Sequence, residues 1–321
     1  MSFHRDVQSE NADFNFEIQK VGIQDVKKRI EINRKDGNYS INLDIKAFIN
    51  LPENQRGIHM SRSAESIDEC ITEHVYAPMG CVEEFGVNIA RSLLDKHAYA
   101  SKSYVELEGP LILQMRQRED RESTQSDYFI NCKVSASRKN DNSNGYDLDI
   151  RLGAIAQGII ACPCGQEMSR EFSKEILSKR KDIAVDEETI ETILNVIPLA
   201  THNQRATGRI MVQEPEAGTV DVLQIIKVIE GSMSGKISGI LKRPDEAFLI
   251  RVAHQDPLFT EDVLRRMALN LANDEFDALS DEMEVEMKII SMESIHPHQA
   301  TAATKTTLGR LRAALEQKNK T

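Results

Sequence analysis

Apolar and polar residues alternate strictly in several stretches of the chain. The apolar positions of the two clearest stretches are Tyr39, Ile41, Leu43, Ile45 and Ala47, and Met283, Val285, Met287 and Ile289. A period of two is typical of a strand with one buried and one solvated face. A chain with such stretches in both halves is expected to build antiparallel sheets.

The first half predicts the order strand, strand, helix, helix, strand, strand. A turn at 35–37 precedes the strand at 39–47, and the sequence Ser66 to Glu69 has the pattern of a capping box that opens the first helix. The second helix carries Phe85, Ile89 and Leu93 at helical spacing. The closing strands are expected near 105–113 and at 128–136.

The second half repeats this order. Strands are predicted at 146–161, 209–213 and 283–289, with a helix from Thr219 and a longer helical region over 244–273. The triplet Asn-Gln-Arg occurs at 54–56 and again at 203–205, near the start of the helical part of each half. This recurrence supports an internal duplication.

The polar run SRKNDNSNG at 137–145 has turn-forming composition and divides the sequence almost in half. The prediction is therefore an α+β protein with two modules, 1–136 with a flexible N-terminal arm and 146–321, joined by this linker. A length of 321 residues suits two such modules. The charged segment 167–197 does not fit the duplication and is predicted to be a helical insertion.

The composition argues against several classes of partner. A net charge of −11 disfavours a nucleic-acid-binding or membrane-binding surface. The longest apolar stretch, 152–161, is too short to span a bilayer, and the N-terminus lacks the apolar core of a signal peptide. We therefore expect a cytoplasmic protein whose five cysteines are thiols.

Cys162 and Cys164 flank a proline in a C-P-C motif, and His202 follows the predicted insertion. Cysteine and histidine are ligands suited to zinc or ferrous iron. If Cys162 and His202 form one site, the insertion must leave and return to nearly the same point. A second candidate cluster, Glu293 to His298, follows the strand at 283–289. The alternative is that the cysteines are small buried hydrophobes and the histidines are surface residues.

Six motifs occur in order along the chain: LPENQRGIHMSRSAES, CPCGQEM, THNQR, LKRPDEAF, FTED at 259–262 and MESIHPH. Together they resemble the type IB GTP cyclohydrolase family over nearly the whole chain, and the insertion after C-P-C resembles its archaeal, methanopterin-pathway branch. The resemblance implies the tunnelling fold (T-fold), in which each module has two strands, two helices and two strands.

The resemblance also implies roles for individual residues. Those implied to ligate a divalent metal are Cys162, His202, Glu246 and His296, of which His296 is either a ligand or the proton donor. Glu261 is implied to hold the guanine base by accepting two hydrogen bonds. Cys164 and His298 are neighbours of the site.

Other assignments rest on less. The cations expected to bind the triphosphate are His59, Arg62, Lys242 and Arg243, each of which is also an ordinary surface residue. Glu246 and Glu261 each fall in the expected first turn of a helix, where the helix dipole favours an acid without any function.

The implied activity is that of a metal-dependent GTP cyclohydrolase. Water activated by the metal attacks carbon 8 of guanine, formate leaves and the ring recloses to a 7,8-dihydropterin. For the archaeal branch the product is 7,8-dihydroneopterin 2',3'-cyclic phosphate and the metal is Fe(II), with Mn(II) or Zn(II) as alternatives. The bacterial product, 7,8-dihydroneopterin triphosphate, is the alternative product.

A homo-oligomer is also expected, a tetramer or a dimer of dimers, because closing a barrel removes the exposed sheet edges of a single chain. Two other functions remain open. One is a T-fold enzyme in which Cys162 attacks the substrate as a thiol nucleophile without metal. The other is a non-catalytic protein that binds metal or purine.

Overall fold

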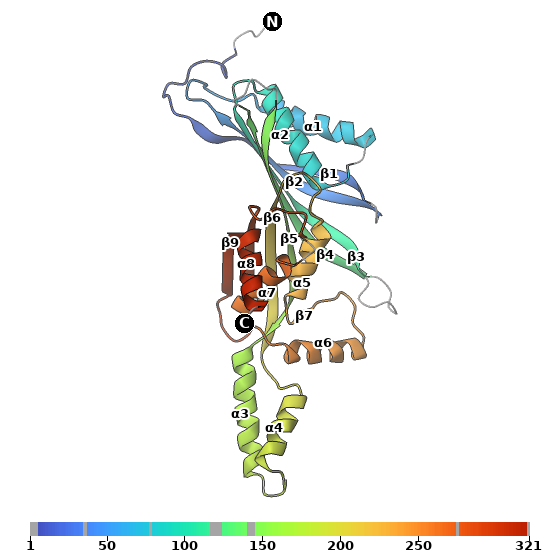
Figure 1. Ribbon diagram of the computed structural model, residues 1–321. Coiled ribbons are helices and arrows are strands. Elements are labelled where there is room, and N and C mark those ends of the chain that lie inside the picture. Colours follow the sequence, from blue (N-terminus) through green and yellow to red (C-terminus); the bar gives the residue numbers. More distant parts are fainter. Residues whose placement is uncertain are drawn as a thin grey trace. The chain divides into compact units, whose positions relative to one another are not determined.

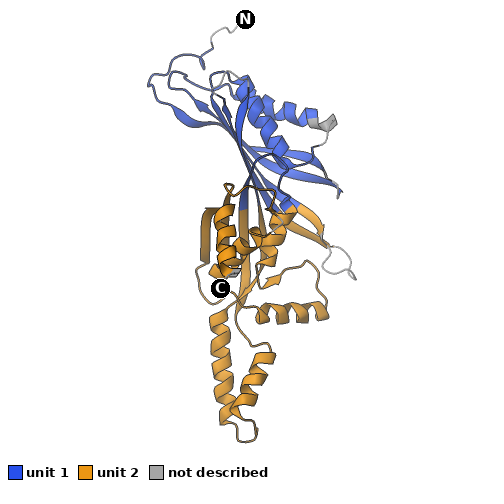
Figure 2. Cartoon of the chain, viewed as in Figure 1, with its two compact units in different colours: residues 1–111, 129–153, 211–222 blue, residues 112–128, 154–210, 223–321 orange. Residues whose placement is uncertain are grey.

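The computed structural model describes residues 6–34, 37–76, 79–115, 124–139, 145–273 and 276–319. The chain forms two compact units, each built from separate segments: 1–111, 129–153 and 211–222 in unit 1, and 112–128, 154–210 and 223–321 in unit 2 (Figure 2). The two predicted modules are continuous ranges that follow the order of the elements, so their boundaries differ from those of these units. Residues 35–36 of the predicted turn and 140–144 of the predicted linker lie outside the described residues.

The elements follow the predicted duplicated order (Figure 1). The first half contains β1 (Ile18–Arg34), β2 (Gly37–Leu51), α1 (Met60–Tyr76), α2 (Val82–Lys96), β3 (Lys102–Met115) and β4 (Thr124–Arg138). The second half contains β5 (Tyr146–Ala161), α3 (Pro163–Lys179), α4 (Glu187–Val196), β6 (Asn203–Glu214), α5 (Val222–Gly231), β7 (Gly235–Lys236), α6 (Arg243–Gln255), α7 (Thr260–Leu271), β8 (Glu284–Ser291), β9 (Ala300–Thr307) and α8 (Leu308–Asn319). None of the described helices has the length and apolar character needed to cross a membrane.

The strands join in the order β1-β2-β3-β4-β5-β6-β8-β9, and the short β7 pairs with β5. The registers described for β1 with β2, β2 with β3, β5 with β7 and β8 with β9 are all antiparallel. β1 and β9 are the outermost strands. The architecture is therefore the predicted α+β arrangement on an antiparallel sheet.

The predicted alternation is confirmed in both halves. In β2, Ile41, Leu43, Ile45 and Ala47 are at most 3% exposed, and in β8 Val285, Met287 and Ile289 are at most 2% exposed. In α2, the predicted stripe of Phe85, Ile89 and Leu93 is fully buried. Covering these strand faces removes their apolar side chains from water, which is the main favourable contribution to folding.

The predicted start of the first helix was wrong. Ser66 does not cap a helix, since α1 begins six residues earlier and the Ser66 hydroxyl donates to the carbonyl of Arg62 at 2.8 Å. The predicted helical region 244–273 consists of two helices, α6 and α7, in agreement with the helix starts expected near Glu246 and Glu261. The break falls at Pro257, which lacks an N–H and disfavours helical geometry at the residue before it.

The insertion forms a pair of helices, α3 and α4, with an apolar cluster of its own. Ile190, Leu194 and Leu199 are buried in it, and Leu177 and Val185 pack against them. Lys174 on α3 pairs with two α4 carboxylates, Glu187 at 3.0 Å and Glu191 at 2.6 Å. The predicted helical insertion is thus confirmed, although its first helix begins at Pro163.

Unit 1 buries two carboxyl groups against each other. Glu83, in the first turn of α2, is 2% exposed, and Glu214, at the end of β6, is 3% exposed. The two side chains share a hydrogen bond, and Glu214 also accepts from the N–H of Val220 at 3.0 Å. Burial, with repulsion from Glu83, raises the pKa of Glu214 to about 8, and burial raises the pKa of Glu83 as well. The pair therefore holds a proton at neutral pH.

This pair predicts that the protein loses stability as pH rises. Its folded-state pKa lies above the ordinary glutamate value of about 4.3, so the native state binds more protons than the unfolded chain up to about pH 8. The free energy of unfolding, measured by urea titration, is expected to fall between these two pH values. Glu214→Gln keeps an acceptor for Val220 and is expected to flatten the fall, whereas Glu282→Gln, at an exposed position, leaves it in place. A wild-type stability that is constant over this range would refute the shared proton.

Candidate functional site

Cys162 and His202 meet at the base of the insertion. The N–H of Cys162 donates to the carbonyl of His202 at 3.0 Å, and the hydroxyl of Thr201 donates to the carbonyl of Cys162 at 2.7 Å. Residues at the end of β5 and the start of β6 are therefore held side by side, while 163–201 leave and return between them. This is the arrangement that the sequence requires if the two residues form one site.

Cys162 is the N-cap of α3. Its sulfur accepts the N–H of Gly165 at 3.4 Å, and Pro163 follows it in the first turn, where the lack of an N–H costs no hydrogen bond. The side chain of Cys162 is partly buried, whereas that of Cys164 is exposed, and both are free thiols.

The His202 ring is oriented by a polar network that the sequence interpretation missed. Its Nδ1 lies 3.0 Å from the Gln204 side-chain oxygen and 3.3 Å from the Ser294 hydroxyl. Gln204 in turn contacts Ser291 and Glu293, each at 3.1 Å. The sequence carried a signal for this contact, because His202 directly precedes β6 and residues two apart in an extended segment point to the same face.

The remaining predicted metal ligands lie at exposed positions of unit 2. Glu246 is in the first turn of α6, and His296 lies in the connection from β8 to β9, where its ring stacks on that of His298 at 5.1 Å between centroids. Among the described residues, no three histidine, cysteine, aspartate or glutamate side chains are grouped closely enough to hold a metal ion. In the described part of a single chain, Cys162 and His202 therefore lie together, but Glu246 and His296 are not grouped with them.

Glu261 lies in the first turn of α7, exposed, and its carboxylate accepts the hydroxyl of Thr260 at 3.0 Å. At the start of α6, Lys242 is the N-cap and Arg243 the first helical residue, and both are exposed. The helix-start positions expected for Glu246 and Glu261 are thus observed. The helix dipole accounts for acids at such positions equally well, so the roles of Glu246 and Glu261 stay predictions.

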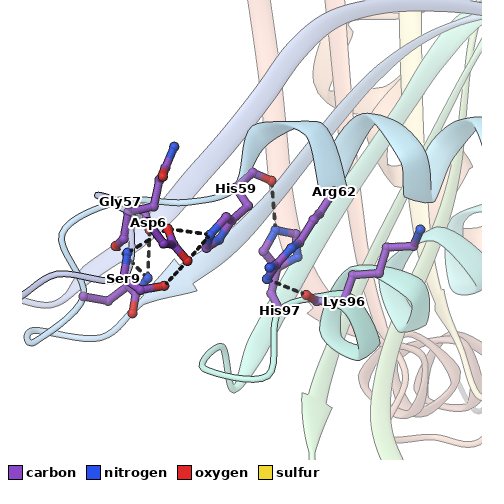
Figure 3. Close-up of polar contacts among 9 residues, drawn as sticks. Asp6, Ser9, Gly57, His59, Arg62, Lys96 and His97 are labelled. Carbon is purple, nitrogen blue, oxygen red and sulfur yellow. Dashed lines mark hydrogen bonds and ion pairs between the residues drawn. The ribbon is translucent and has the colours of Figure 1, made fainter. Parts of the chain in front are cut away.

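His59 and Arg62 lie at the start of α1 in unit 1 (Figure 3). The carboxylate of Asp6 approaches His59 Nε2 at 3.1 Å through both oxygens, and it also accepts the hydroxyl of Ser9 at 2.7 Å. Arg62 donates to the carbonyl of Lys96 at 3.2 Å. The Asp6 carboxylate thus already occupies Nε2 of His59, and the role of His59 in binding phosphate stays a prediction.

His97, which lies beside His59 and Arg62, has a structural role. His97 is fully buried, and its Nδ1 lies 2.8 Å from the carbonyl of Leu93 while its Nε2 lies 3.3 Å from the carbonyl of His59. Burial lowers the pKa of His97, so the ring is neutral near pH 7 and donates only one hydrogen bond. The shorter contact identifies that donor as Nδ1.

Comparisons with known proteins agree with one another. The profile of a family described as "Type I GTP cyclohydrolase folE2" matches residues 4–302. A protein named GTP cyclohydrolase MptA from Methanococcus aeolicus is 36% identical over 312 residues, covering 97% of this chain and 99% of the relative. A protein of the same name from Methanocaldococcus jannaschii is 34% identical over 316 residues, covering 98% and 99%.

Among solved structures, a uricase from Bacillus fastidious superposes with a TM-score of 0.52 over 92% of this chain and 96% of its own, at 11% identity. At that identity the likeness concerns the fold alone. Together with the duplicated order of elements, it confirms the predicted tunnelling fold.

The close packing at the base of the insertion predicts that Gly165→Ala is destabilising. A Cβ at Gly165 would lie 2.6 Å from the Thr201 hydroxyl oxygen and 3.3 Å from His202 Cδ2. Relieving that overlap is expected to cost about 1–3 kcal/mol of unfolding free energy in urea titration. Gly231→Ala is the matched control, because its Cβ would meet nothing within 4 Å. Equal effects of the two substitutions would contradict the packing argument.

Proposed function

Since the chain belongs to the type I GTP cyclohydrolase family, we propose that this GTP cyclohydrolase depends on a divalent metal ion, Fe(II) in the first instance, and releases 7,8-dihydroneopterin 2',3'-cyclic phosphate for methanopterin synthesis in the cytosol. The relatives named MptA and the helical insertion support this branch. The triphosphate product is the alternative within the same activity.

The observation that carries the metal proposal is the pairing of Cys162 with His202. A thiolate and an imidazole suit Fe(II) or Zn(II) better than they suit Mg(II). His202 also has the second contact that metal-ligating histidines usually make, since Gln204 engages its Nδ1 and leaves Nε2 for a metal. The residues present therefore fit a metal ion as part of its ligand set.

When bound, the metal would lower the pKa of a coordinated water and so permit attack on carbon 8 of guanine near neutral pH. We assign the other roles to residues of this chain. The Glu261 carboxylate accepts hydrogen bonds from the ring N–H and the exocyclic amine of guanine. The alternative to metal ligation for His296 is to donate a proton to the imidazole nitrogen as the ring opens. His59 and Arg62 bind phosphate oxygens.

We further propose that the complete site requires a homo-oligomer. Two of the four proposed metal ligands are joined in the described part of one chain, and Glu246 and His296 are not joined to them. The outermost strands β1 and β9 leave sheet edges that a second copy could pair with. Tetrameric assembly with sites at the subunit boundaries would supply the missing ligands, and light scattering of the active enzyme tests it. An active monomer would contradict this assembly.

The first test compares the two cysteines of the C-P-C motif. With GTP and Fe(II) under anaerobic conditions, Cys162→Ala is expected to lose bound metal and to lower kcat/KM by more than the roughly 100-fold that loss of an outer-shell partner costs. Cys164→Ala, at the exposed position, is the matched control and is expected to retain both properties. Equal losses in the two variants would overturn the assignment. Full activity of the wild type in a chelator would instead favour Cys162 as a thiol nucleophile.

The second test identifies the product. Mass spectrometry of the reaction mixture is expected to show a dihydropterin carrying a cyclic phosphate, together with released formate. Retention of all three phosphates would reject the archaeal product and leave the cyclohydrolase activity intact. The absence of any pterin with Fe(II), Mn(II) or Zn(II) would reject the metal-dependent mechanism.

A further inference from the structure

A chain of hydrogen bonds runs from Glu293 to His202. Ser291 ends β8 and is fully buried, and Gln204 in β6 is 9% exposed. The N–H of Met292 donates to the carbonyl of Arg205 at 2.8 Å, which fixes the two segments beside each other. The network therefore rests on backbone pairing rather than on mobile surface side chains.

The direction of each hydrogen bond follows from the Glu293 end. Oε1 of Glu293 lies 2.7 Å from the Ser291 hydroxyl and 3.1 Å from Nε2 of Gln204. A carboxylate only accepts hydrogen bonds, so both neighbours must donate to it. The Ser291 hydroxyl has then used its one hydrogen, and its oxygen accepts the second N–H of Gln204 at 3.1 Å. Both N–H groups of the Gln204 amide nitrogen therefore donate to Ser291 and Glu293.

The opposite end of the Gln204 amide must then be its oxygen, which lies 3.0 Å from Nδ1 of His202. An amide oxygen cannot donate, so this contact is a hydrogen bond only if Nδ1 carries the proton. In a neutral imidazole the lone pair then resides on Nε2.

We infer that Glu293, acting through Gln204, fixes His202 as the Nδ1–H tautomer and so keeps Nε2 available as a donor atom. Glu293 and Gln204 are positioning residues in this scheme. The tautomer follows from the network alone, whereas its use in binding a metal rests on the proposed function.

Ser294 cannot set the tautomer, although its hydroxyl lies 3.3 Å from the same Nδ1. A hydroxyl both donates and accepts, so it satisfies either protonation state of the nitrogen. Ser294 is also exposed, with water available as a substitute partner. Ser294→Ala therefore serves as a matched control. It removes a contact of Nδ1 but leaves Gln204 and Glu293, which fix the tautomer, in place.

The test is nuclear magnetic resonance of the metal-free protein labelled with ¹⁵N-histidine, at a pH well above the ordinary imidazole pKa of about 6.5. Comparison with His202→Asn identifies the His202 signals. We expect the Nδ1–H tautomer in the wild type and in Ser294→Ala. Glu293→Gln introduces a donor that allows the Gln204 amide to turn over, so this isosteric variant is expected to populate the Nε2–H tautomer.

A predominant Nε2–H tautomer in the wild type, or an unchanged Nδ1–H tautomer in Glu293→Gln, would overturn the inference. The melting temperature of each variant shows whether it is folded. Titration with Zn²⁺ alone gives a second measurement, in which Glu293→Gln is expected to bind about 10–100-fold more weakly than Ser294→Ala. Equal Zn²⁺ affinities would overturn the link to metal binding. Failure of the wild type to turn over GTP, with the Nδ1–H tautomer present, would instead refute the proposed function.

Discussion

The backbone hydrogen bond from Cys162 to the carbonyl of His202 is the constraint on which the rest of the candidate site depends. It joins the end of β5 to the start of β6, and the polar contacts of the His202 ring are made from Gln204 in β6 and from Ser294, which follows β8. This hydrogen bond holds Cys162 at the N-cap of α3 close to His202, whose ring contacts Gln204. Without that contact the thiol and the imidazole would be separated by a 39-residue excursion of the chain.

Much of the fold could be predicted because it depends on local pattern. The alternation in β2 and β8 and the stripe of α2 follow from spacing along the sequence, whereas the shared site of Cys162 and His202 was implied by the family resemblance. Helix boundaries were less predictable, since a serine such as Ser66 bonds equally well to a carbonyl inside a helix.

Other features could not be predicted, because they arise when residues far apart in the sequence meet. Nothing in the local sequence around Glu83 or Glu214 distinguishes it from other glutamates. The two side chains share a proton only because folding packs them against each other. Glu293, which orients the His202 ring through Gln204, lies 91 residues further along the chain, in the segment that follows β8. The sequence also offers no pattern from which the division into two discontinuous compact units would follow, since that depends on which parts of each long strand are packed together.

The helix pair α3–α4 has its own apolar cluster and both of its ends return to one point. Because the two helices are folded and their ends lie together, the segment behaves like a short loop, and closing it between Cys162 and His202 costs little chain entropy. Evolution could therefore lengthen, shorten or remove it while Cys162 and His202 stay together. The same property makes the tip of the hairpin, between Lys179 and Glu187, a natural point for inserting a foreign domain, such as a fluorescent reporter, into this chain.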